Sequence, residues 1–304
     1  MKKFVLKALF FGVCVVVMDA LFGFGFSWLR GHAIGGSTAN CEYIANRAND
    51  DIIIFGSSRA SHHYIPQIIE DSLGVSCYNC GEEGNGVVLA YGRLKMMTNR
   101  YKPKLIVFEI TPGYDYGIKE PNTKYLGYLR AYYNKSGIEE IFDVFDGEFS
   151  RLKMRSKMYQ NTGRLLPDII DNIIYRDNQK GYTPLYGKMN QKSTLDNNVV
   201  DKTMEIDSIK LSYVEKVIEL ALSNDIPIIF TISPRYGLNS RTSNYEPAFS
   251  LCKKRGVPVY NFINYPSIAD NAVYFQDGDH MNHKGAEAYT NMLVTKVLNK
   301  IIHK

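Results

Sequence analysis

The chain has 304 residues, of which 45% are hydrophobic and 22% are charged. This composition excludes an intrinsically disordered protein and supplies enough apolar side chains for a large core. The formal net charge is +5, and beyond three lysines near the N-terminus the basic residues are dispersed among acids. No nucleic-acid-binding surface is therefore indicated.

The N-terminal segment from Phe4 to Leu29 is nearly all apolar. A helix of about 22 to 26 residues is long enough to cross a hydrocarbon layer of about 30 Å. Its deep charge, Asp19, costs about 3 kcal/mol, which the Phe, Leu and Val residues offset. A cleaved signal peptide is the alternative, but no small-x-small cleavage site follows. The lysines before the segment predict a cytoplasmic N-terminus and an external body.

We expect a membrane anchor at residues 1–30, a linker at 31–50 and one folded domain at 51–304. Five short apolar runs are typical of buried parallel strands: Asp51–Phe55, Val75–Asn79, Leu105–Ile110, Ile226–Ile232 and Val257–Phe262. Helical patterns lie between or after them: Pro66–Leu73, Val87–Asn99, Ile209–Ser223, Tyr245–Arg255 and a last helix from about Asn282. This alternation predicts an α/β fold, a doubly wound sheet with helices on both faces.

Residues from about 112 to 207 break this pattern and form a polar, tyrosine-rich insertion. Its tyrosines include Tyr114, Tyr116, Tyr125, Tyr128, Tyr132, Tyr133, Tyr159, Tyr182 and Tyr186. A structureless loop of this length is improbable, so we expect a partly helical side lobe. Tyrosine has a flat apolar face for a sugar ring and a polar hydroxyl, so carbohydrate binding is one interpretation and packing of the lobe is the other.

The five cysteines predict neither a disulfide nor a metal site. Cys77 and Cys80 form a C-x-x-C motif, but on a strand their Cα atoms would be roughly 10 Å apart, which is too far for a disulfide. No second pair completes a zinc site. Packing in the core is the better interpretation.

The first strand is followed by Gly56, Ser57, Ser58 and Arg59. Ligands of open α/β sheets collect beyond the carboxyl ends of the strands. A glycine followed by serines allows a sharp turn that exposes a hydroxyl group, although serine is also a common helix N-cap. Arg59 is expected either to bind a substrate carboxylate or to pair with a surface acid.

The last candidate motif is Asp277-x-x-His280, just before the final helix. A serine hydroxyl needs an adjacent imidazole to take its proton, and the imidazole needs a carboxylate to fix its tautomer. Asp279 and His283 form a rival pair with similar spacing. His62 and His63 have no acid at a fixed spacing, so we expect them at the rim of the site.

Taken together, these motifs resemble the SGNH, or GDSL-like, hydrolase superfamily. Gly56-Ser57-Ser58 stands where the family has Gly-Asp-Ser, the stretch Asn79-x-Gly81-x-x-Gly84 matches its second block, and Asp277-x-x-His280 matches its last. The resemblance implies a flavodoxin-like sheet, Ser58 as nucleophile, His280 as base and Asp277 as its orienting acid. It also implies an oxyanion hole that includes the N–H groups of Ser58 and Gly84.

One block of this resemblance is missing. The family has Gly-x-Asn-Asp after the third strand, whereas this chain has Glu109-Ile110-Thr111-Pro112-Gly113. Thr111 or Asn85 is the candidate substitute for the absent oxyanion donor. The Gly-Ser-Ser-Arg variant and the N-terminal anchor resemble branches that act on cell-envelope polymers.

Three functions are therefore compared. The expected one is hydrolysis of acylated envelope glycans, with an acyl group on Ser58 and without a metal or cofactor. The second is transfer of the acyl group to a polysaccharide or wall polymer, with partner proteins of the envelope. The third is an inactive, anchored glycan-binding module, which the presence of serine, acid and histidine together argues against.

Overall fold

The computed structural model describes residues 1–118, 126–147, 149–175, 179–189, 204–237 and 245–303. The chain divides into two compact units. One comprises residues 1–47 and 122–177, and we call it the N-terminal unit. The other comprises residues 48–121 and 178–304, and we call it the sheet unit.

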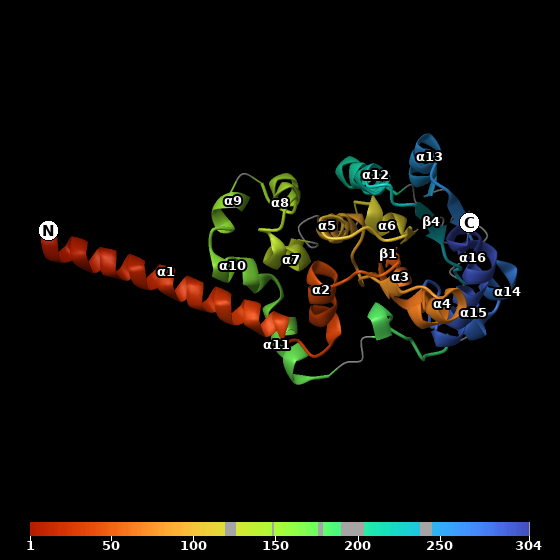
Figure 1. Ribbon diagram of the computed structural model, residues 1–304, viewed down its shortest axis with the longest axis horizontal. Coiled ribbons are helices and arrows are strands. Elements are labelled where there is room, and N and C mark those ends of the chain that lie inside the picture. The colour runs from red at the N-terminus through yellow and green to blue at the C-terminus, as the bar shows by residue number, and fades with distance from the viewer. Residues whose placement is uncertain (119–125, 148, 176–178, 190–203, 238–244, 304) are drawn as a thin grey trace. The chain divides into compact units, whose positions relative to one another are not determined.

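The sheet unit contains five parallel strands (Figure 1). They are β1 (Ile52–Phe55), β2 (Cys77–Asn79), β3 (Leu105–Glu109), β4 (Ile228–Ile232) and β5 (Val259–Asn261). Their order, β2-β1-β3-β4-β5, is that of flavodoxin-like folds. The predicted doubly wound sheet is confirmed, and the strands are one to three residues shorter than the apolar runs that predict them.

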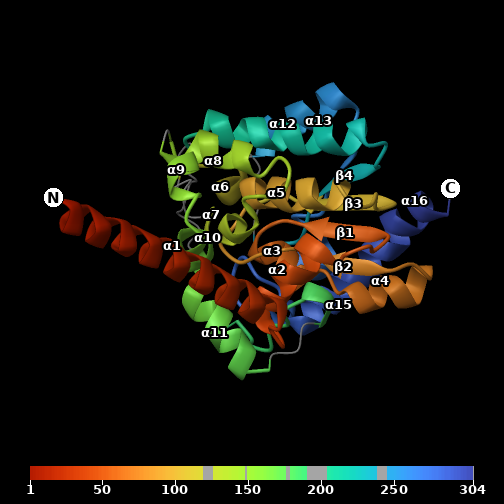
Figure 2. The same ribbon diagram turned by 60° about the vertical axis from the view of Figure 1, so that its left-hand side comes forward.

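Helices cover both faces of this sheet. They are α3 (Ser58–His63), α4 (Pro66–Leu73), α5 (Val87–Thr98), α6 (Pro112–Asp115), α12 (Ser208–Ser223), α13 (Glu246–Arg255), α14 (Pro266–Ala269), α15 (His283–Leu293) and α16 (Asn299–Ile302). Figure 2 shows α5, α12 and α13 on one side of the strands and α4 and α15 on the other. Helix α15 buries Tyr289 and Leu293, and Val297 in the π-helical turn that follows it is buried as well, so these residues share one apolar face. Cys77 and Cys80 are buried free thiols.

The N-terminal unit is helical. Its elements are α1 (Lys2–Gly31), α2 (Gly36–Asn46), α7 (Leu126–Leu129), α8 (Glu139–Phe145), α9 (Ser150–Lys153), α10 (Lys157–Asn161) and α11 (Leu165–Ile173). Among the described residues, α1 is the one helix long and apolar enough to cross a membrane, a property that signal sequences share. Figure 1 shows its N-terminal half extending without neighbouring elements.

The segment predicted as a linker is mostly the helix α2. Its Thr38 is buried and donates its backbone N–H to Asp171 and its hydroxyl to Asp168, both on α11, with distances of 3.0 Å. These partners lie 130 or more residues away in the sequence, so composition alone gives no sign of them. Residues 36–46 are therefore part of a packed unit.

Asp19 has protein partners, contrary to the prediction of a lone charge inside lipid. Its carboxylate accepts a hydrogen bond from the Ser156 hydroxyl at 2.5 Å and from the backbone N–H groups of Lys157 and Met158 at 2.7 and 3.0 Å. These are N–H groups of the first turn of α10, which have no partner inside the helix. The carboxylate therefore caps α10.

Replacing Asp19 with leucine separates the two interpretations of this residue. If Asp19 were only an unfavourable charge in an apolar helix, its replacement would raise the free energy of unfolding. Because Asp19 caps α10, we expect Asp19→Leu to lower the free energy of unfolding of the full chain in detergent by about 1 to 2 kcal/mol. Leu21→Ala, a change at an exposed position of α1, is the control. An unchanged or raised free energy for Asp19→Leu would contradict the capping role.

Candidate active site

Ser58 begins the helix that follows the first strand. Gly56 turns the chain with φ +147°, and a Cβ atom there would lie 2.7 Å from the carbonyl oxygen of Glu109. The turn places Ser58 at the first position of α3, with its Oγ 2.8 Å from Nε2 of His280. Ser57 is instead buried, and its hydroxyl donates to Thr111 Oγ1 at 2.8 Å. Of the two serines, Ser58 is the one beside the imidazole.

His280 is held on its other side by Asp277. Its Nδ1 lies 3.0 Å from both carboxylate oxygens of Asp277, which also accepts the backbone N–H groups of Asp279 and His280. Partial burial raises the pKa of Asp277, but the hydrogen bond from the His280 ring and those from the backbone outweigh it, and the pKa falls to about 2. An ionised Asp277 accepts a hydrogen bond from Nδ1–H, which leaves Nε2 free to accept the Ser58 proton. The three groups have the geometry of a serine–histidine–aspartate triad.

The rival pair is not formed. Asp279 forms an ion pair with Arg235. His283 contacts the hydroxyl of Tyr182 at 2.9 Å and lies 3.5 Å from Glu287. Neither residue therefore orients the other.

The predicted oxyanion donors differ in what they contact. The N–H of Ser58 belongs to the first turn of α3, where a helix leaves its N–H groups without internal partners. Gly84 has φ +65°, a conformation that favours glycine. The Asn85 side chain is buried and donates to the Glu83 carbonyl, while its Oδ1 has no partner among the described residues. Thr111 accepts from Ser57 and donates its N–H to Asp115 at 2.6 Å. A side-chain donor to the oxyanion stays a prediction.

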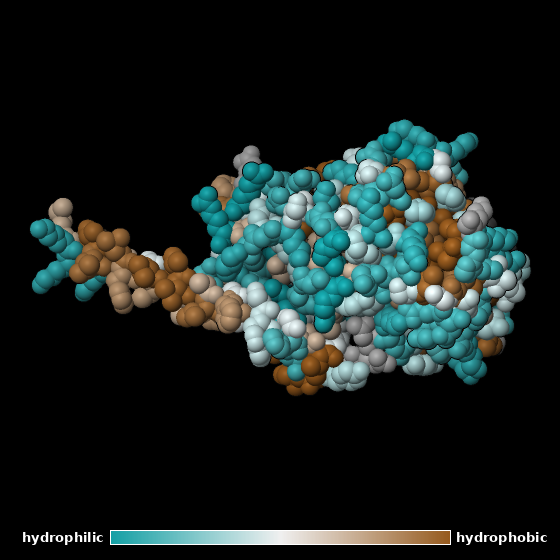
Figure 3. All heavy atoms as spheres, viewed as in Figure 1, coloured by the Kyte–Doolittle hydropathy of each residue, from teal (hydrophilic) through white to brown (hydrophobic). Residues whose placement is uncertain are grey.

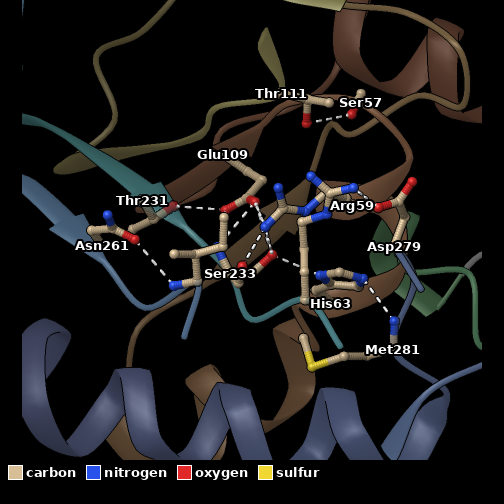
Figure 4. Close-up of polar contacts among 12 residues, drawn as sticks. Ser57, Arg59, His63, Glu109, Thr111, Thr231, Ser233, Asn261, Asp279 and Met281 are labelled. Carbon is tan, nitrogen blue, oxygen red and sulfur yellow. Dashed lines mark hydrogen bonds and ion pairs between the residues drawn. The ribbon is translucent and has the colours of Figure 1, made fainter. Parts of the chain in front are cut away.

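Arg59 is buried rather than exposed at the surface. This burial contradicts both expected roles, binding of a substrate carboxylate and pairing with a surface acid. Its guanidinium is buried and pairs with the buried Glu109 carboxylate at 2.9 Å. It also donates to Ser233 (Figure 4). A further hydrogen bond goes to the Tyr245 hydroxyl. For a group enclosed in this way we expect a structural role.

The two histidines of α3 are buried, so their predicted place at the rim is wrong. His63 Nδ1 lies 2.7 Å from Ser233 Oγ, and its Nε2 accepts the backbone N–H of Met281 at 2.9 Å (Figure 4). Burial and the nearby Arg59 charge hold the pKa of His63 well below its ordinary value, so the ring is neutral and its Nε2 can accept. His63 thus joins α3, the helix that begins with Ser58, to the residue after His280.

The second sequence block holds α3 in place. The Asn79 side chain donates to the carbonyl oxygens of Ala60 and Tyr64 at 2.7 and 3.0 Å and accepts the N–H of Gly81. A Cβ atom on Gly81 would lie 2.4 Å from the backbone nitrogen of Ser61. The asparagine and this glycine therefore bring β2 and α3 into close contact.

Comparisons with known proteins give only distant likenesses. No family model matches the chain, and no curated protein matches it. Among solved structures, an acetyl xylan esterase (AlAXEase) is similar with 9% identity and a TM-score of 0.40, over 81% of this chain and 99% of that one. A GDSL-like lipase from Bacteroides thetaiotaomicron VPI-5482 is similar with 10% identity and a TM-score of 0.37, over 82% and 87%. At this level the likeness identifies neither a family nor a substrate.

Arg59→Ala tests the structural role of the buried ion pair. Removing one partner leaves the Glu109 charge buried and unpaired, so we expect unfolding to require about 3 to 5 kcal/mol less. The control is Arg151→Ala, which breaks an exposed pair with Asp143 and should change the free energy of unfolding far less. Denaturant unfolding of the two variants measures both values. A stable Arg59→Ala protein with weakened substrate binding would restore the predicted substrate contact.

Proposed function

We propose that this protein is a serine ester hydrolase. The observation that carries the proposal is the alignment of Ser58 Oγ, His280 and Asp277, with 2.8 Å between hydroxyl and imidazole and 3.0 Å between imidazole and carboxylate. A serine hydroxyl is a weak nucleophile unless a base takes its proton. This alignment supplies the base and fixes its tautomer.

The reaction follows from these contacts. His280 takes the hydroxyl proton while Ser58 Oγ attacks the ester carbonyl, and the oxyanion of the tetrahedral intermediate accepts the Ser58 N–H. The protonated His280 then gives its proton to the leaving alcohol, which departs from the acyl-enzyme. Water, deprotonated by His280, attacks the acyl carbonyl and releases the acid and the free serine. A sugar hydroxyl in place of water gives acyl transfer, and the products distinguish the two outcomes.

A fluorophosphonate probe tests the nucleophile, because it labels activated serines covalently. We expect full-length protein in detergent to be labelled and Ser58→Ala to lose the label. Ser58→Ala and His280→Ala should each lower ester turnover by about 10³-fold or more, and the double variant should be little worse, since the pair acts as a unit. Ser57→Ala is the control. Labelling that survives Ser58→Ala would exclude this nucleophile.

Asp277 and Asp279 can be compared on one substrate. Asp277→Asn should lower turnover by up to about 10⁴-fold without unfolding the protein, because an amide cannot hold the required imidazole tautomer. Asp279→Asn removes only the ion pair with Arg235 and should have a much smaller effect. Steady-state kinetics and circular dichroism of both variants provide the measurement. An equal or larger loss for Asp279→Asn would overturn the assignment.

We further propose acylated glycans as the substrate. Several tyrosines of the insertion pack inside the protein, including Tyr116, Tyr132 and Tyr182, and Tyr125 lies outside the described residues. Tyr186 is 74% exposed, and its ring centroid lies 5.6 Å from that of His283, three residues after His280. An exposed ring next to the base loop is placed to stack against a sugar.

Tyr186→Ala tests this contact. We expect the KM for an acetylated sugar to rise about five- to tenfold, the loss of about 1 kcal/mol of stacking, with kcat unchanged. The KM for a small aliphatic acetate ester should not change. Tyr175→Ala, at an equally exposed tyrosine of the N-terminal unit, serves as the control. Equal effects on sugar and aliphatic esters would remove the support for a glycan substrate.

The membrane anchor is also part of the proposal. The exposed apolar length of α1 and the three lysines at its start, Lys2, Lys3 and Lys7, support a single span with a cytoplasmic N-terminus. This topology places the sheet unit outside the cytoplasm, where acylated envelope glycans are available as substrates.

A further inference from the structure

Helix α11 has the reverse of the usual arrangement for a helix in water. Its two aspartates, Asp168 and Asp171, are each 2% exposed. Its Leu166 and Ile173 are 70% and 75% exposed, and Ile169 and Ile170 are exposed as well. A surface helix in water turns its apolar stripe inward and its charges outward. This helix therefore requires an apolar environment on its outer side.

The orientation of α11 is fixed by hydrogen bonds. Asp168 accepts the Thr38 hydroxyl and Asp171 accepts the Thr38 N–H. Rotation of the helix to bury its apolar side would break both bonds and leave the Thr38 donors buried without partners, which is unfavourable. The apolar side is thus held outward.

Helix α11 lies beside the C-terminal end of α1. The Asn172 side chain donates to the Leu29 carbonyl at 2.9 Å, and the Ile34 N–H donates to the Asp171 carbonyl at 3.0 Å. Figure 3 shows apolar residues along the free length of α1 and a second apolar patch at the position of α11 in Figure 1. Helix α1, the candidate membrane span, and the neighbouring helix α11 therefore both expose apolar surface.

The C-terminal half of α1 has one polar side and one apolar side. Asp19 binds α10, whose neighbourhood includes the exposed cations Arg155 and Lys157. Leu21, Phe24 and Trp28 are exposed and lie about 140° to 200° around the helix from Asp19. The apolar segment Phe4–Leu29 is about 39 Å long, which exceeds a hydrocarbon layer of about 30 Å and favours a tilted helix. If a tilted α1 is followed toward its C-terminus, the face that carries Asp19 emerges from the lipid before the face that carries Trp28.

We propose that α1 crosses the bilayer obliquely and that α11 rests on the outer leaflet, with its Leu and Ile side chains in the interfacial layer. The occupant of this surface is lipid, because the surface adjoins the end of the helix proposed to enter the same bilayer. Trp28 on α1 and Tyr175 after α11, both exposed, are of the aromatic types that favour the membrane interface. This inference depends on the proposed insertion of α1.

Tryptophan fluorescence in vesicles tests both steps separately, because Trp28 is the single tryptophan of the chain. The full-length protein is reconstituted into phosphatidylcholine vesicles with bromine atoms near the headgroup end of the acyl chains, where they quench nearby indoles. Ile173→Trp and Leu166→Trp, each in a Trp28→Phe background, report on α11. Val144→Trp, at an exposed apolar position of α8, is the matched control.

We expect Trp28 in the unaltered protein to be quenched, and the indoles of Ile173→Trp and Leu166→Trp to be quenched to a similar fraction. The indole of Val144→Trp should instead be quenched by aqueous iodide. If Trp28 is quenched but the indole of Ile173→Trp or of Leu166→Trp is not, the placement of α11 on lipid is overturned and the insertion of α1 stands. Blue-shifted but unquenched emission from α11 would show that protein covers it, which also overturns the inference. An unquenched Trp28 would remove the oblique insertion of α1 itself.

Discussion

The buried charge of Glu109 is the constraint on which the geometry of the site depends. Its carboxylate lies at the end of β3 and accepts the Ser233 N–H at 3.0 Å, in addition to pairing with Arg59. Arg59 directly follows Ser58, and Ser233 contacts His63, which accepts the backbone N–H of Met281, the residue after His280. Ser58 and His280, 222 residues apart in the chain, are thus tied to the same interior charge. A buried charge is tolerated only with such partners, so the network has little freedom to shift.

This use of β3 gives a physical account of the departure from the family pattern. At the end of β3 the resemblance leads one to expect an asparagine that donates to the oxyanion, whereas this chain has Glu109 and then Thr111, whose hydroxyl accepts from Ser57. The end of the strand therefore stabilises the turn that carries Ser57 and Ser58. Loss of one oxyanion donor typically costs about 3 to 4 kcal/mol of transition-state stabilisation. In the proposed reaction, such a loss would leave a larger share of that stabilisation to the backbone N–H of Ser58.

The sequence predicts the sheet and the motif positions well, because both follow from local patterns. Apolar runs mark the strands, and the carboxyl ends of parallel strands share one edge, which brings Ser58 and His280 together. The roles of Arg59 and His63 could not be predicted in this way. Their partners, Glu109, Ser233 and Met281, are distant in sequence, and an arginine or histidine after a strand gives no local sign that it will be buried. The same holds for Asp19, whose partner Ser156 is 137 residues away.

The N-terminal unit shows what acids contribute to such distant contacts. Helix α10 has five residues and α2 has eleven, lengths at which an isolated helix is marginal in water. Carboxylates stabilise such helices because they accept N–H groups that a helix leaves without partners, as Asp19 does for α10 and Asp171 for Thr38 of α2. A helix that turns its acids inward for this purpose must turn other residues outward. On α11 these outward residues are leucine and isoleucine. Such residues are compatible with a stable fold when lipid, rather than water, contacts the outer side of the helix.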